Sequence, residues 1–352
     1  MGHSTYSASE MMSRRKKIKE EKGDDVFTYT KRASRSGGGI ALPLDPAFGG
    51  FRYANDPVSG EETEPFTLVL DVTGSNREAA KKVWEDLPQF FSLLNTHSWV
   101  PNHLQVQLGF VGDATCDSYP LQLSQFEGGS DIDKWLNLAI LEGGGGGSKQ
   151  ESYQNAMWAL NNQNKLASWE RGKKGALIFV FDEQFYPYVS PSELQKMYAR
   201  RDPSDLGDVK DIQISEGMKK HTLDVLNLPS TQIPTGEVIE ELKQKYHVWG
   251  VICKESGYYG DATIMNPWRD AFGEQNIMSL PSANDISELC ATILAAHYGA
   301  NPSDILSEFK PLVSAETLFY LEEAAEKVYD LAPVNTNITT CSENAESDAG
   351  YL

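Results

Sequence analysis

The segment Asp71-Val72-Thr73-Gly74-Ser75 concentrates oxygen donors in a short stretch of chain. It follows the apolar run 66–70 directly and precedes a helical pattern, so it is predicted to lie at the end of a buried strand. One carboxylate and two hydroxyls on a tight loop suit a hard cation such as Mg²⁺, Mn²⁺ or Ca²⁺ better than a soft metal. A simpler interpretation of the same residues is that Ser75 caps the N-terminus of the following helix.

Three further loops carry residues of the same kind. Gly112-Asp113-Ala114 ends a second apolar run, and Phe181-Asp182-Glu183 ends another. Between these two loops, five glycines at 143–147 precede Glu151-Ser152, which open a helical pattern. Five glycines are typical of a loop that lets the backbone come close to a bound ion or partner.

Ligands of parallel α/β sheets bind at the carboxyl ends of the strands, near the point where the strand order reverses. We therefore expect the strand-end loops to meet there. Three carboxylates that converge without a cation would cost several kcal/mol, since each pair ~4 Å apart repels by roughly 1 kcal/mol in water and about 4 kcal/mol at an effective dielectric constant of 20. Convergence thus predicts a cation, whereas the alternative is that the acids cap separate helices and point apart.

Apolar runs recur at 66–71, 104–111, 175–181, 247–252 and 276–280, each of the length and composition expected of a strand covered on both faces. Helical patterns lie between them at 77–94, 151–166, 236–245 and 283–297. The alternating segment 121–126 is predicted to be an antiparallel edge strand. This order indicates an α/β fold with a doubly wound, mostly parallel sheet, and the long connection 186–235 is expected to hold short helices or a functional insertion.

The composition along the chain predicts three parts. Residues 1–62 are polar and mixed in charge, which is typical of a flexible leader. Residues 63–299 hold the strands and helices of the α/β domain. Residues 300–352 are expected to form a helical extension, with a helix around 315–330, and a disordered polar tail.

At this point the chain resembles the von Willebrand factor A domain over roughly residues 66–298. The metal-ion-dependent adhesion site of that family uses a D-x-S/T-x-S loop, which Asp71, Thr73 and Ser75 match fully, and an aspartate ending the fourth strand, which Asp182 matches. Phe181 and Glu183 replace the usual threonine and glycine beside that aspartate. Glu151 stands where integrin β-type members place a glutamate, with Gln150 in place of their proline.

The resemblance implies a Rossmann-like fold and a site for Mg²⁺, or for Mn²⁺ or Ca²⁺. Its expected ligands are Asp71, Thr73, Ser75, Glu151 and Asp182, supported by Asp113, Ser152 and Glu183. Thr73 and Ser75 would bind the cation directly, Glu151 would add a carboxylate, and Asp71 and Asp182 would act through coordinated waters. One position would remain open for an acidic group of a protein partner. The opening Met1-Gly2-His3-Ser4 and the five glycines also look like uncharacterised bacterial and phage members of the family.

The implied function is that of a non-catalytic, divalent-cation-dependent adaptor, alongside an AAA-type ATPase by similarity to intracellular members. The alternative is a metal-dependent phosphohydrolase of the haloacid dehalogenase-like kind with Asp71 as its nucleophile, because Asp113 and Asp117 form a G-D-x-x-x-D string. Such enzymes need a second aspartate where Thr73 stands, and their G-D-x-x-x-D comes later in the chain. A third interpretation is a scaffold whose metal site is vestigial. A phosphate-binding P-loop at 143–150 is excluded, because Ser148 and Gln150 break its pattern.

Charge and cysteine usage limit the other classes. The net charge of −19 argues against general nucleic-acid binding, which depends on neutralising phosphates. No apolar run approaches the ~18 residues of a membrane span, and no secretory signal is visible at the N-terminus. Four scattered cysteines without C-x-x-C spacing fit a reducing compartment and no zinc site. We therefore expect a cytoplasmic protein that contacts neither nucleic acid nor membrane.

Overall fold

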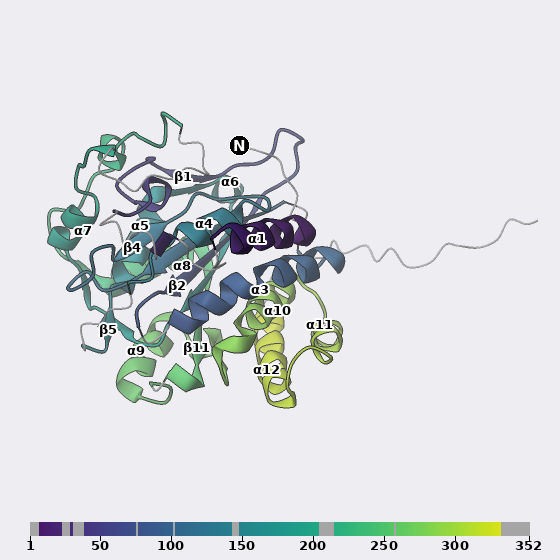
Figure 1. Ribbon diagram of the computed structural model, residues 1–352. Coiled ribbons are helices and arrows are strands. Elements are labelled where there is room, and N and C mark those ends of the chain that lie inside the picture. The colour runs from purple at the N-terminus through teal and green to yellow at the C-terminus, as the bar shows by residue number, and fades with distance from the viewer. Residues whose placement is uncertain are drawn as a thin grey trace, which may run out of the picture.

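A six-stranded sheet forms the centre of the molecule (Figure 1). The computed structural model describes residues 7–22, 29–30, 39–74, 77–100, 103–142, 148–203, 215–256 and 258–331. The strand order is β12-β11-β7-β2-β3-β4. Every neighbouring pair is parallel except β3 with β4. The strands are β2 (Glu64–Asp71), β3 (Leu104–Val111), β4 (Leu121–Leu123), β7 (Gly175–Val180), β11 (Tyr246–Cys253) and β12 (Ile277–Leu280). The predicted doubly wound sheet with one antiparallel edge strand is confirmed.

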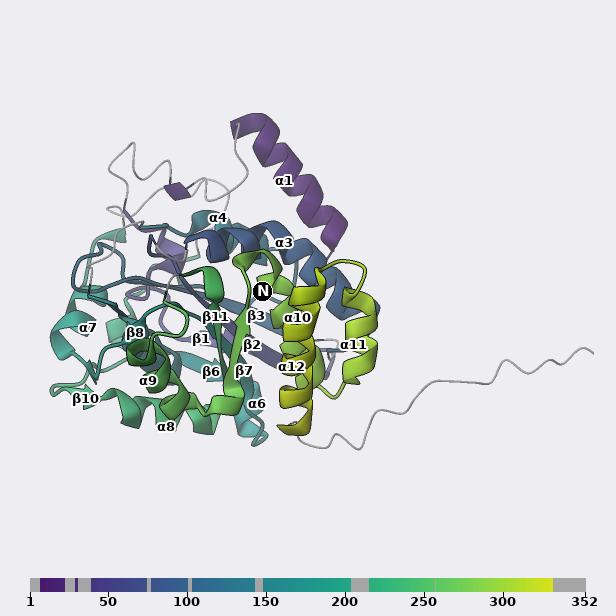
Figure 2. The same cartoon turned by 90° about the horizontal axis from the view of Figure 1, so that it is seen from below.

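Helices cover both faces of this sheet, which Figure 2 shows as a layer between them. One face carries α3 (Arg77–Thr96), α4 (Ile132–Leu138), α10 (Ile286–His297), α11 (Pro302–Phe309) and α12 (Ala315–Leu331). The other face carries α5 (Tyr153–Gln163), α8 (Thr235–Lys245) and α9 (Ala262–Phe272). The sequence patterns predicted α3, α5, α8, α10 and α12 within a few residues. They did not predict α9, which connects β11 to β12.

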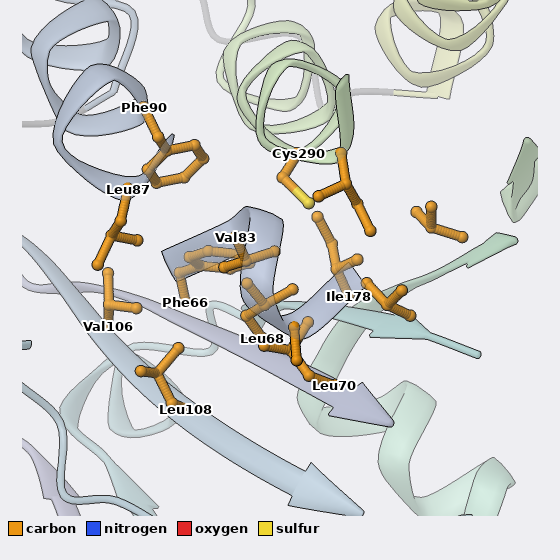
Figure 3. Packing of buried hydrophobic residues seen from close by; sticks show 14 of the residues in the cluster. Phe66, Leu68, Leu70, Val83, Leu87, Phe90, Val106, Leu108, Ile178 and Cys290 are labelled. Atoms are coloured by element: carbon orange, nitrogen blue, oxygen red, sulfur yellow. The ribbon is translucent and has the colours of Figure 1, made fainter. Parts of the chain in front are cut away.

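The inner strands contribute to two hydrophobic cores, because successive side chains point to opposite faces of a sheet. Phe66, Leu68 and Leu70 of β2 pack on the α3 side, where they meet Val83 and Leu87, as Figure 3 shows. Val69, between them, packs on the α5 side. The central strands are therefore apolar at nearly every position, which is why their sequence shows continuous runs. This double burial fixes the strand ends that carry the candidate site.

The described parts of the predicted leader pack against the domain. α1 (Ala8–Lys22) lies along α3, and Arg15 forms an ion pair at 2.7 Å with the buried carboxylate of Asp133. Ile40, Ala41 and Leu44 are buried in the core on the α3 side. β1 (Arg52–Ala54) pairs in parallel with β6 (Asn164–Leu166). These residues contribute to the folded body, which a composition dominated by polar residues did not indicate.

A side chain of the edge strand β4 binds the segment after α4. The amide of Gln122 donates from Nε2 to the carbonyl of Ile140 at 2.8 Å, and its Oε1 accepts from the Ile140 amide at 2.8 Å. Gln122 is fully buried, and its side chain satisfies both backbone groups of Ile140. The η1 turn (Leu42–Leu44) lies next to the same strand.

The connection 186–235 holds short elements in its described parts. These are β9 (Tyr188–Val189), α7 (Pro191–Met197), the η3 turn (Thr222–Asp224) and β10 (Ile233–Pro234), which pairs antiparallel with β9. Ser75, the glycines 143–147 and the tail 332–352 lie outside the described residues. Within the described ranges, no helix combines the length and the apolar character that crossing a bilayer requires.

Candidate metal centre at the carboxyl edge of the sheet

The candidate site lies where the strand order reverses. From β2 the chain moves to β3 on one side and returns to β7 on the other, so the ends of β2, β3 and β7 meet at the switch point of a doubly wound sheet. The register aligns these ends: Asp71 pairs with Val111, and Leu70 pairs with Val180. The loops after all three strands therefore begin at the same level, which brings together acids from distant parts of the sequence.

Asp71 is fully buried, and protein donors hold both of its oxygens. Oδ1 accepts from the Thr73 amide at 2.7 Å and from the Thr73 hydroxyl at 2.6 Å, while Oδ2 accepts from the Tyr153 hydroxyl at 2.5 Å. Asp182, 111 positions away in the sequence, lies close enough to Asp71 to affect the pKa of its carboxyl group.

A two-stranded parallel sheet positions Glu151. β5 (Gln150–Glu151) pairs with β8 (Gln184–Phe185), the strand that follows Glu183. Ser152 then fixes this segment to the loop after β3, because its amide donates to the Gly112 carbonyl and its hydroxyl accepts from the Ala114 amide at 2.8 Å. Glu151 is only 1% exposed, and its Oε2 has no hydrogen-bond partner among the described residues.

Asp113 lies on the wall of the site formed by the loop after β3. Its carboxylate accepts from the amide and the hydroxyl of Thr115, and from the hydroxyl of Tyr186 at 3.2 Å. The Asp113 amide donates to Asp117 at 2.7 Å. Asp113 is therefore buried and held by donors in the part of the chain that the structure describes, consistent with a supporting place in the site.

Trp268 of α9 packs against the loop after β7. Its indole N–H donates to the Glu183 carbonyl at 2.9 Å, and its ring stacks on Phe181 with the centroids 4.1 Å apart. The same ring meets Tyr153 edge to face at 5.1 Å. One fully buried tryptophan thus positions both the acidic loop 181–183 and the tyrosine that binds Asp71.

Burial and mutual repulsion raise the pKa values of carboxyl groups in the site. Burial, followed by the charges of Asp71, Glu183 and Asp113, raises the pKa of Glu151 to about 10. Burial and the charge of Asp71 raise the pKa of Glu183 to about 7, against the opposing charge of Lys149. Burial also raises the pKa of Asp71, although the bonds from Thr73 and Tyr153 lower it in part. At neutral pH and without a cation, this cluster is expected to retain protons that carboxyl groups in water lose.

The residues present fit a small hard cation in their chemistry. The orphaned Oε2 of Glu151 is a buried acceptor with no protein donor in the described residues. The Thr73 hydroxyl gives its one proton to Asp71, so its lone pairs are directed away from that carboxylate. Within the described ranges, no three His, Cys, Asp or Glu side chains come close enough to hold a metal by themselves. The expected ligand set depends on hydroxyls as well, and Ser75, one of them, lies outside the described residues.

The geometry does not favour Asp71 as a nucleophile. Attack on phosphorus needs a carboxylate oxygen that is accessible and free of strong donors. Oδ1 and Oδ2 of Asp71 both accept hydrogen bonds of 2.7 Å or less, and the side chain is fully buried.

Sequence reasoning missed three side chains of this candidate site. Tyr153 and Tyr186 donate to the two aspartates, and Trp268 supports both loops. Tyr153 follows the expected ligand Glu151 by two positions, which is a signal that could have been used. Tyr186 and Trp268 approach from a loop and a helix that no pattern connected to the site.

The chain is only weakly similar to known proteins, in sequence and in structure. The sequence matches no protein-family model and no curated protein. The pilus adhesin SpaC from Lactobacillus rhamnosus GG, in its open conformation, aligns with a TM-score of 0.43 and 12% identity over 71% of this chain and 31% of its own. The vWF domain of the type V pili tip protein Mfa5 from Porphyromonas gingivalis aligns with a TM-score of 0.37 and 12% identity over 73% of this chain and 98% of its own.

A third structure, the proximal thread matrix protein 1 from the mussel byssus, aligns with a TM-score of 0.37 and 10% identity over 68% of this chain and 49% of its own. The chain thus spans about a third of the SpaC adhesin and about half of the mussel protein. Likeness at this level concerns at most the fold and extends to no activity, ligand or partner.

Proposed function

We propose that this chain is a protein-binding module in which a divalent cation, held at the carboxyl edge of the sheet, accepts a carboxylate of the partner. The observation that carries the proposal is Glu151, a buried acid among other acids whose Oε2 has no donor in the described residues. A buried charge without a partner is costly, and a cation removes that cost. The magnesium-type coordination expected of hydroxyl and carboxylate oxygens supports the same choice.

The chain's own residues have distinct parts in this proposal. Asp71 orients the Thr73 hydroxyl by accepting its proton, and Tyr153 holds Asp71 in place. Glu151 and Asp182 supply negative charge from two other loops. A bound Mg²⁺ would supply a Lewis-acidic position for an acidic group of the partner. Residues of the loops around the cluster would contact the rest of that partner.

Calorimetric titration with MnCl₂ tests the cation site directly. We expect wild type to bind one Mn²⁺ and the Thr73→Ala variant to bind at least tenfold more weakly, because a ligand hydroxyl is lost. Thr263→Ala is the matched control. Thr263 donates its amide and hydroxyl to Asp261 Oδ1 at 2.9 and 2.6 Å, in the same Asp-x-Thr arrangement, but on the exposed N-terminus of α9.

Equal Mn²⁺ affinity in wild type, Thr73→Ala and Thr263→Ala would refute direct binding by Thr73. The partner is addressed by capture experiments from lysate with Mg²⁺ or with EDTA. Proteins retained in Mg²⁺ and released by EDTA from wild type, but never retained by Thr73→Ala, are the expected result. The proposal that the partner is an AAA-type ATPase complex is tested by the same experiments, through the identity of the retained proteins.

A further inference from the structure

A small cavity lies beside the candidate metal centre. It has a volume of about 110 Å³ and is bounded by the segment 40–46, the loop between β3 and β4, and α7 with the residues after it. A single water needs roughly 10–15 Å³ of such space, so the cavity can hold a functional group of several atoms. Its charged lining residues are Asp45, Asp117, Glu193, Lys196 and Arg201.

Asp45 is the acid that lacks a full set of partners. It is 0% exposed, and its Oδ1 accepts from the Ala47 amide at 3.0 Å and from Arg201 Nη2 at 2.9 Å. Its Oδ2 is buried and has no hydrogen-bond partner in the described part of the chain. An ionised carboxylate offers about four acceptor positions, so Arg201 does not saturate it. Asp45 lines the cavity, and a buried acceptor without a donor is a candidate partner for a cationic group that enters there.

The charges around the cavity favour a positively charged donor. Three carboxylates and two basic side chains line it, and the chain as a whole carries a net charge of −19. Fields of this kind concentrate cations in a cleft. Without a donor at Oδ2, burial raises the pKa of Asp45 to about 6, although the charges of Arg201 and Arg52 lower it in part.

The cavity and the metal centre share a wall. Ala114 and Asp117 line the cavity, while the Ala114 amide donates to Ser152 and Asp117 accepts from the Asp113 amide. Glu193, on the far side of the cavity, accepts from Asn155 in the first turn of α5. The loop between β3 and β4 therefore separates the two places.

We propose that this cavity binds a basic side chain, an ammonium or guanidinium group, of the same partner segment whose carboxylate reaches the metal centre. The inference rests on the proposed function for the identity of the partner. The pairing of Asp45 Oδ2 with a cation does not depend on it. The two parts can therefore fail separately.

Titration with methylguanidinium chloride in EDTA at constant ionic strength tests the cavity alone. We expect saturable NMR shifts of the Arg201 Nε–H and Ala47 amide signals in wild type. Asp45→Asn should weaken the binding at least fivefold, because the acceptor loses its charge. Lys196→Gln removes a repelling charge from an exposed position and should tighten the binding about two- to fivefold.

Lys219→Gln, on an exposed lysine that pairs with Glu216, is the matched control and should leave the affinity unchanged. If Asp45→Asn does not fold, Glu193→Gln and Lys196→Gln decide the question, because they must change the affinity in opposite directions. NMR shifts that rise linearly without saturation would overturn the proposal. A saturable affinity that is the same in wild type and in all of these charge variants would also overturn it and leave a cavity filled by water.

A library of immobilised heptapeptides, each with a fixed central aspartate and one arginine, glutamine or glutamate at a varied position, tests the link to the metal centre. In Mg²⁺ we expect arginine to be preferred at one spacing from the aspartate, and Asp45→Asn to lose that preference but keep Mg²⁺-dependent binding. Mg²⁺-dependent binding without a preference for arginine would refute the shared segment. Absence of Mg²⁺-dependent binding with normal methylguanidinium titration would instead count against the proposed function and against the link, and would keep only a cation pocket.

Discussion

Replacing Glu151 by glutamine should stabilise the protein when no divalent cation is present. The carboxyl group of Glu151 is 1% exposed and surrounded by Asp71, Glu183 and Asp113, which raise its pKa to about 10. In the unfolded chain the same group titrates near 4.5. At pH 7 folding must therefore place a proton on Glu151, and this lowers the free energy of unfolding. Glutamine has nearly the same shape and needs no proton.

The magnitude follows from the two pKa values. Between pH 4.5 and 7, about 2.5 pH units at ~1.4 kcal/mol each give an upper limit of roughly 3.5 kcal/mol for the stability that wild type loses relative to Glu151→Gln. Relaxation of the site and entry of water reduce this value, so we expect about 1–3 kcal/mol. The sign is fixed: a raised carboxyl pKa means that stability is complete below 4.5 and declines as the pH rises towards 10.

Urea unfolding in EDTA, at pH 4.5 and at pH 7, measures the difference between the two proteins. The free energies of unfolding should nearly coincide at pH 4.5, and Glu151→Gln should be the more stable at pH 7. Addition of 10 mM Mg²⁺ at pH 7 should reduce or reverse the difference, because the cation takes the place of the proton in wild type. A Glu151→Gln variant that is less stable than wild type in EDTA at pH 7 would show that the acid is not strained by its neighbours.

Three further substitutions test other parts of the structure. Tyr153→Phe removes the donor to Asp71 and should cost about 1–2 kcal/mol in the free energy of unfolding and weaken Mn²⁺ binding, as urea titration and calorimetry would measure. Burial raises the pKa of Glu288 to about 7, so stability is complete below its ordinary value of 4.5 and declines up to pH 7; Glu288→Gln should gain about 1–3 kcal/mol over wild type at pH 8 and nothing at pH 4.5. Arg52→Met leaves the carbonyls of Phe48 and Leu123 without their donor in the core and should cost about 3–5 kcal/mol in urea unfolding; a loss below 1 kcal/mol would contradict the assigned bonds.

The sequence predicted the sheet because its strands are buried on both faces. Runs such as 175–181 and 247–252 are apolar at nearly every position, because their side chains pack alternately into the two cores. The meeting of Asp71 and Asp182 at the switch point follows from the strand order alone. The predicted places of Glu151 and Asp113 at this edge agree with the structure, while their binding of a cation stays a prediction.

Other parts depend on contacts that a single sequence does not encode locally. Asp45 lies in a segment that composition assigned to a leader, and its partner Arg201 is 156 positions away. Trp268 belongs to α9, whose apolar positions gave no sign that its ring would lie under the site. Each of these pairs becomes visible only when distant elements pack together. Polar residues that are buried by such packing look, in the sequence, like ordinary surface residues.

The pairing of Gln122 with the backbone of Ile140 bears on how the segment after α4 is anchored to the sheet. Both bonds are buried, and they join the amide and the carbonyl of Ile140 to one side chain of the edge strand. Substitution by leucine would keep the volume but leave both backbone groups without their partner, and each such loss costs about 1–3 kcal/mol. Hydrogen exchange at the Ile140 amide should therefore become faster in that variant while the central strands stay protected.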